Sequence, residues 1–60
     1  MKAIYKQEAD LGDVEVIEWN AYEGEIIYSV EYSSDPMVDT SWYRDKAKAI
    51  AHAQFLAGRY

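Results

Sequence analysis

Apolar and polar residues alternate along much of residues 1–43, with the period of a β-strand. The alternation is cleanest over residues 25–33, where the apolar positions Ile26, Tyr28, Val30 and Tyr32 share one face. Further strands are predicted over residues 2–8, 14–22 and 38–43. Clusters of turn-forming residues separate these strands, at residues 8–13, 21–24 and 33–36.

The strand predicted over residues 14–22 has apolar residues on both of its faces. Val14 and Val16 share one face, whereas Ile17 and Trp19 share the other. This change of phase predicts a β-bulge near Val16 and Ile17. The strand is expected to end in a hairpin loop whose glycine, Gly24, is free to take a left-handed conformation.

Beyond residue 43 the apolar period becomes that of an α-helix. Asp45 is the expected N-cap of a helix over residues 45–57, and Gly58 is expected to close it. One stripe of this helix should pack on the sheet, namely Ala49, Ile50, Ala53, Leu56 and Ala57. The chain is therefore predicted to be a single α+β domain over residues 1–60. It would be an antiparallel meander of three to four strands with one C-terminal α-helix packed on one face.

The segment from Tyr43 to Ala53 resembles the end of many small bacterial and phage domains. In those domains an aromatic strand end leads into a capped Lys-x-x-Ala-Ile-x-x-Ala helix. The resemblance implies that the helix packs closely on the sheet through its alanines.

With 60 residues, the chain is so short that its core needs strong packing or a partner. It has no cysteine, which excludes disulfides and thiolate zinc sites. Two Trp, six Tyr and one Phe supply the large side chains of the expected core. The N-terminus shows no signal-peptide pattern and no apolar run approaches the ~20 residues of a membrane helix, so a cytoplasmic protein is expected.

Charge is strongly segregated along the chain. Residues 1–43 contain two cations and ten carboxylates, a net charge of −8, whereas residues 44–60 carry +3. Ordinary surfaces mix both signs, and like charges on neighbouring strands destabilise a sheet. The asymmetry therefore favours contact with a partner that has a basic surface. The alternative is an acidic face that only keeps the protein soluble.

Acidic residues on adjacent strands form a two-dimensional array. Carboxylates at i and i+2 of a strand lie about 6.6–6.8 Å apart, and neighbouring strands about 4.8 Å apart. Such an array approximates the phosphates of a nucleic acid and can occupy a groove that binds one. The predicted partner-binding residues are Glu15, Glu18, Tyr22, Glu23, Glu25 and Glu31.

In size, charge and architecture the chain resembles phage-encoded inhibitors of host defence, including anti-CRISPR and anti-restriction proteins. That resemblance implies a non-enzymatic inhibitor or regulator that occludes a nucleic-acid site on a host protein. Direct DNA binding, as in the similar strand-and-helix arm-binding domains of tyrosine recombinases, is disfavoured because those sheets carry cations.

Other candidate chemistry finds little support. His52 lacks a partner for catalysis and is expected on the outer helix face with Lys48. The cluster of Asp10, Asp13 and Glu15 lacks the twelve-residue ligand loop of a calcium site. We therefore expect no catalytic residue, no metal and no cofactor.

A second contact patch is predicted on the helix. Phe55 lies off the apolar stripe, beside Ala51. It either covers the edge of the core or forms a patch for self-association, since clustered exposed apolar surface usually has a use. The alternative function is therefore a small assembly module that homodimerises through the helix and an edge strand.

Overall fold

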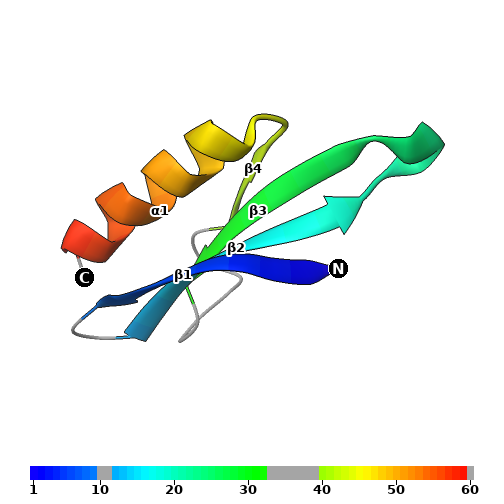
Figure 1. Ribbon diagram of the computed structural model, residues 1–60. Coiled ribbons are helices and arrows are strands. Elements are labelled where there is room, and N and C mark those ends of the chain that lie inside the picture. The colour runs from blue at the N-terminus through cyan, green and yellow to red at the C-terminus, as the bar shows by residue number, and fades with distance from the viewer. Residues whose placement is uncertain (10–11, 33–39, 60) are drawn as a thin grey trace.

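The computed structural model describes residues 1–9, 12–32 and 40–59. These residues form an antiparallel four-stranded sheet, in the order β1-β2-β3-β4, and one α-helix (Figure 1). The predicted α+β class, a strand meander with a C-terminal helix on one face, is confirmed. The elements are β1 (Lys2–Ala9), β2 (Gly12–Asn20), the 3-10 turn η1 (Tyr22–Gly24), β3 (Ile26–Tyr32), β4 (Ser41–Tyr43) and α1 (Lys46–Arg59).

Some predicted bounds need correction. Tyr22 belongs to the turn and not to the strand predicted over residues 14–22. The strand predicted over residues 38–43 is paired from Ser41, and its residues 38–39 lie outside the described part of the chain. The turn predicted at residues 33–36 also lies outside it.

The predicted bulge belongs to the neighbouring strand. Val16 pairs with Tyr5 and Ile17 with Ala3, so Ile4 is the extra residue, on β1. The pairing of β2 with β3 runs without a shift. The apolar residues of β2 therefore change faces by ordinary alternation, because Val16 and Ile17 are neighbours and point to opposite sides.

The helix begins as the sequence predicts and ends later. The Asp45 Oδ1 atom accepts hydrogen bonds from the backbone N–H groups of Ala47, at 2.9 Å, and Lys48, at 3.4 Å. These bonds satisfy donors that the first helical turn leaves free. Gly58 does not close the helix: α1 continues through it to Arg59.

The core lies between α1 and one face of the sheet. Val14, Val16 and Val30 supply the sheet side, and Ala49, Ala53 and Leu56 the helix side. All six are buried, with at most 5% exposure. The two alanines have short side chains, which lets the helix approach the strands closely. Tyrosines then pack around this centre, among them Tyr5, Tyr28, Tyr32 and Tyr43.

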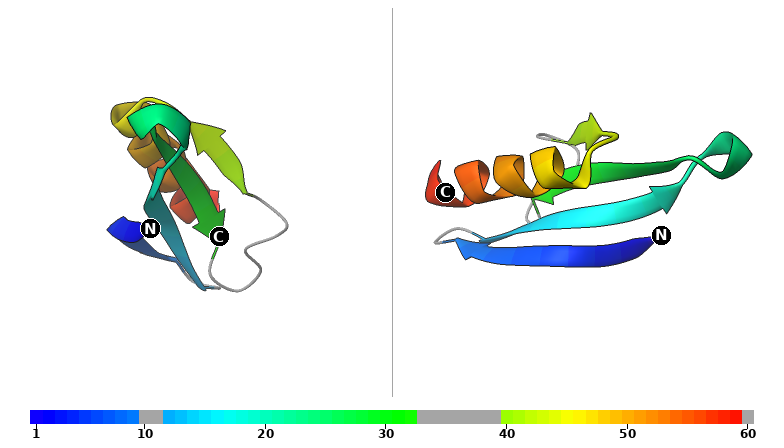
Figure 2. Two further views of the ribbon diagram at one scale, coloured as in Figure 1. Left: turned by 90° about the vertical axis from the view of Figure 1, so that its right-hand side faces the viewer. Right: turned by 45° about the horizontal axis from the view of Figure 1, so that its top comes forward.

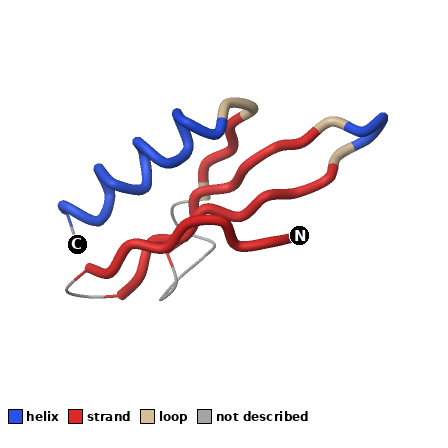
Figure 3. The backbone as a smooth tube through the Cα atoms, in the orientation of Figure 1, coloured by secondary structure: helices blue, strands red, loops and turns tan. Residues whose placement is uncertain are grey.

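The hairpin of β2 and β3 extends past the helix. Figure 2 shows the helix lying along one side of the sheet, with the two strands continuing beyond its N-terminal end. Figure 3 places η1 at the far tip of these strands. The molecule is consequently elongated, with extents of 38 × 20 × 16 Å.

Candidate functional site

One face of the sheet is left open. The helix contacts the side that carries Val14, Val16 and Val30, and no described element packs on the opposite side (Figure 2). Alternation and register place two kinds of residue on this open face. Near the β1–β2 turn it carries Lys6, Glu8, Asp13, Glu15 and Glu31; toward the hairpin tip it carries Ile17, Trp19, Ile27, Ser29 and Trp42.

The acidic half of the open face has carboxylates on three neighbouring strands. Glu15 of β2 lies directly opposite Glu31 of β3. Glu8 of β1 lies directly opposite Asp13 of β2. Like charges in such positions destabilise a sheet. Such pairs are expected to lower folding stability, and Lys6, directly opposite Glu15, offsets part of the repulsion.

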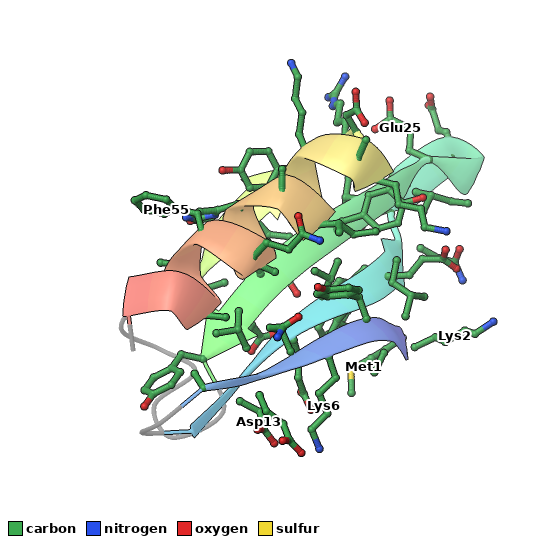
Figure 4. The ribbon with its side chains drawn as sticks, turned by 60° about the vertical axis from the view of Figure 1, so that its left-hand side comes forward. Met1, Lys2, Lys6, Asp13, Glu25 and Phe55 are labelled. Carbon is green, nitrogen blue, oxygen red and sulfur yellow. The ribbon has the colours of Figure 1, made fainter. Side chains whose placement is uncertain are left out.

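Among the described residues of the acidic half, Lys6 is the cation. Its Nζ lies 3.2 Å from Asp13 Oδ2, and both side chains point away from the helix (Figure 4). The hydrogen bond and charge of Asp13, with smaller contributions from Glu15 and Glu8, raise the pKa of Lys6 above its usual value. Lys6 therefore balances the β1 side of the acidic half, away from Glu31 on β3.

The apolar half is centred on the two tryptophans of the chain. The rings of Trp19 and Trp42 lie with centroids 5.9 Å apart, tilted by 54°. Trp42 is 55% exposed, whereas Trp19 is half-buried. Ile17 and Ile27, also half-buried, continue the patch on β2 and β3.

Hydrogen bonds join the two halves. The Trp19 Nε1–H donates to Ser29 Oγ at 2.8 Å, and the Ser29 hydroxyl donates to Glu31 Oε2 at 3.0 Å. Ser29 is fully buried, so both bonds form where water does not compete at its hydroxyl. The chain of bonds fixes the Glu31 carboxylate relative to the tryptophan pair.

The hairpin tip carries three of the predicted partner-binding residues. Tyr22 is 94% exposed. Glu23 has a left-handed backbone, with φ 60° and ψ 29°, and Gly24 follows with φ 77°. Glu25 lies near the helix start, where its Oε1 is 3.8 Å from the Arg44 guanidinium.

The predicted binding residues thus fall into three groups. Glu15 and Glu31 lie together on the open face; Tyr22, Glu23 and Glu25 lie at the tip. Glu18 points to the helix side of the sheet, opposite Tyr28 and Lys2. The sequence alone does not show which face of the sheet each of these residues occupies.

Sequence reasoning missed the tryptophans as part of this surface. The sequence does carry a signal for Trp19. Trp19 and Glu15 lie an even number of positions apart on one strand, so their side chains share a face of the sheet. In the sequence, however, this phase indicates a bulge in that strand. The position of Trp42 could not be foreseen, since it depends on the register of β4 against β3.

The outer side of α1 carries the second predicted patch. Phe55 is 60% exposed and Ala51 is exposed beside it on the helix. Figure 4 shows Phe55 projecting from the helix away from the β1 strand. The sequence predicts His52 on the outer face with Lys48, and this prediction is wrong, because His52 is half-buried. Its Nδ1 lies 3.1 Å from the Tyr43 hydroxyl, and its ring packs edge-on against the ring of Tyr43.

Within the described residues there is no group of three or more His, Cys, Asp or Glu placed to hold a metal ion. No helix among the described residues is long and apolar enough to cross a membrane. A shallow hollow of about 280 Å³ lies at Asn20, Ala21 and Tyr22, beside the tip.

Comparisons with protein-family models, curated proteins and solved structures found no match.

Proposed function

We propose that this protein is a non-enzymatic inhibitor or regulator that binds the basic, nucleic-acid-binding surface of another protein. The open face of the sheet is its contact surface, and the protein is of the kind that phages use against host defence. Carboxylates on adjacent strands stand in for phosphates, and the tryptophan pair beside them supplies apolar contact area.

One observation carries this proposal: Glu15 and Glu31 oppose each other on the face that the helix leaves open. In a chain of 60 residues the core is small, so a repulsive pair is a noticeable part of the total stability. Partner cations would relieve this repulsion on binding. The same pair is unfavourable in the free protein and favourable in the complex.

The test is capture of partners from a bacterial lysate on immobilised protein, with and without excess duplex DNA, read by mass spectrometry. We expect a nucleic-acid-binding protein that is captured at low salt and displaced by DNA. Glu15→Lys should abolish this capture, because it places a cation in the centre of the acidic half. Circular dichroism of the variant should match that of the original protein.

Glu18→Lys is the matched control. It makes the same change in charge three residues along the same strand, but on the opposite face. We expect Glu18→Lys to retain capture. Loss of capture in both variants would show that net charge and not the open face determines binding. Absence of any DNA-displaceable partner would leave the acidic half as a solubilising surface.

A second function is favoured by the exposure of Phe55 and Ala51 on the helix. These residues could join two copies of the protein into an assembly module. The edge strands favour it less. β1 carries a bulge and two lysines, which blunt an edge against pairing, and β4 is three residues long. Any such dimer would therefore form through the helix.

A further inference from the structure

The open face brings an exposed indole and a fixed carboxylate close together. Trp42 on β4 pairs with Ser29 on β3, and Glu31 lies two residues further along β3 on the same face. Diagonal neighbours in an antiparallel sheet lie about 7–8 Å apart. A single long side chain from a partner can therefore contact both.

The carboxylate of Glu31 has acceptor capacity left for such a contact. The Ser29 hydroxyl uses one lone pair of Oε2, and an ionised carboxylate offers about four. The nearest cation of this face, Lys6, is engaged with Asp13 on the other side of β2. Among the described residues, no ion pair joins Glu31 to a cation.

We propose that the open face binds arginine side chains of its partner in preference to lysine side chains. This inference rests on the proposed function and specifies its partner chemistry. The guanidinium group stacks on the Trp42 ring and donates to the carboxylates of Glu31 and Glu15. Arginine is planar, weakly hydrated and able to donate two parallel hydrogen bonds, whereas the lysine ammonium is compact and strongly hydrated.

Charge complementarity supports a partner segment over a second copy of the chain as the occupant. Among its described residues the face carries five charged groups, of which four are carboxylates: Glu8, Asp13, Glu15 and Glu31. Two such faces would repel each other. An apolar ligand would leave these carboxylates without new partners, while an arginine-rich segment supplies both charge and a flat surface for the indole.

The experiment measures binding of dye-labelled oligoarginine and oligolysine peptides of equal length by fluorescence anisotropy at low salt. We expect the arginine peptide to bind several-fold more tightly. Trp42→Leu should weaken arginine binding by about two- to fivefold and lysine binding by less. Trp42→Phe, which keeps a ring, should retain part of the preference.

Glu15→Gln is the matched control, because it removes charge without touching the indole. It should weaken binding of both peptides and leave the part of the arginine preference that comes from the indole. Equal affinities of the two peptides for the original protein would overturn the arginine preference while leaving basic-partner binding intact. If neither peptide binds, both this inference and the proposed function fail. A mass in sedimentation that falls on Trp42→Leu would place a second copy on the face, which also overturns the inference.

Discussion

At the scale of single residues, Glu23 has the least favourable backbone of the described chain. Its φ of 60° and ψ of 29°, with φ 77° at Gly24, fit the two central positions of a type I′ turn. The Glu25 N–H closes the turn on the Tyr22 carbonyl at 3.2 Å. Asn-Gly is the favoured pair at these positions, because asparagine tolerates a left-handed backbone better than glutamate. A strained glutamate beside an exposed tyrosine suggests a use in binding.

Glu23→Asn should therefore stabilise the protein by about 0.5–1 kcal/mol. The change is measured by unfolding the protein in urea and following circular dichroism. The slope of the unfolding free energy against urea concentration should stay unchanged. Glu25→Asn is the control, because it makes the same change two residues later, in extended backbone with φ −66° and ψ 145°. Equal or lower stability of Glu23→Asn would show that the turn does not strain the glutamate. If Glu23→Asn is more stable but no longer captures the partner, the Glu23 carboxylate takes part in binding.

At the scale of elements, alternation in the sequence was sufficient to predict the strands that pack on the helix. In β3 the alternating apolar positions include Tyr28, Val30 and Tyr32. All three belong to the core or pack on it. Alternation does not say which strand of a pair holds an extra residue, so it predicts a bulge on β2, whereas the extra residue lies on β1. Nor does it say how far a helix continues, because Gly58 tolerates helical backbone as well as a left-handed cap.

The alternative function, assembly into a dimer, depends on the outer face of α1. Under that function, the original protein should sediment as a dimer at low micromolar concentration and Phe55→Ser as a monomer. The Phe55 ring is 60% exposed, so its removal should leave the fold intact by circular dichroism. Tyr22→Ser is the control, since it removes an exposed ring at the hairpin tip, away from the helix. A monomer in all three samples would reject helix-mediated dimerisation.

At the scale of the whole molecule, the fold separates the two signs of charge that the sequence separates along its length. The acidic half of the open face lies on strands β1 to β3, while Arg44, Lys46 and Lys48 gather at the start of the helix. The net charge of −5 produces repulsion within the folded protein and would attract the proposed basic partner. Salt screens both, with a Debye length of about 8 Å at physiological ionic strength.

Salt should therefore change folding and binding in opposite directions. Raising NaCl from low to physiological concentration should raise the urea midpoint, because screening relieves the repulsion between Glu15 and Glu31 on the open face. The same change should weaken partner capture, because it screens the attraction that holds the complex together.

The double variant Glu15→Gln and Glu31→Gln should be more stable at low salt, and its stability should change less when salt is added. It keeps a side-chain carbonyl that can accept from Ser29, so the bond to residue 31 is preserved. A midpoint that falls with salt would mean that ion pairs such as Lys6–Asp13 outweigh the repulsion, and that the carboxylates cost the fold nothing.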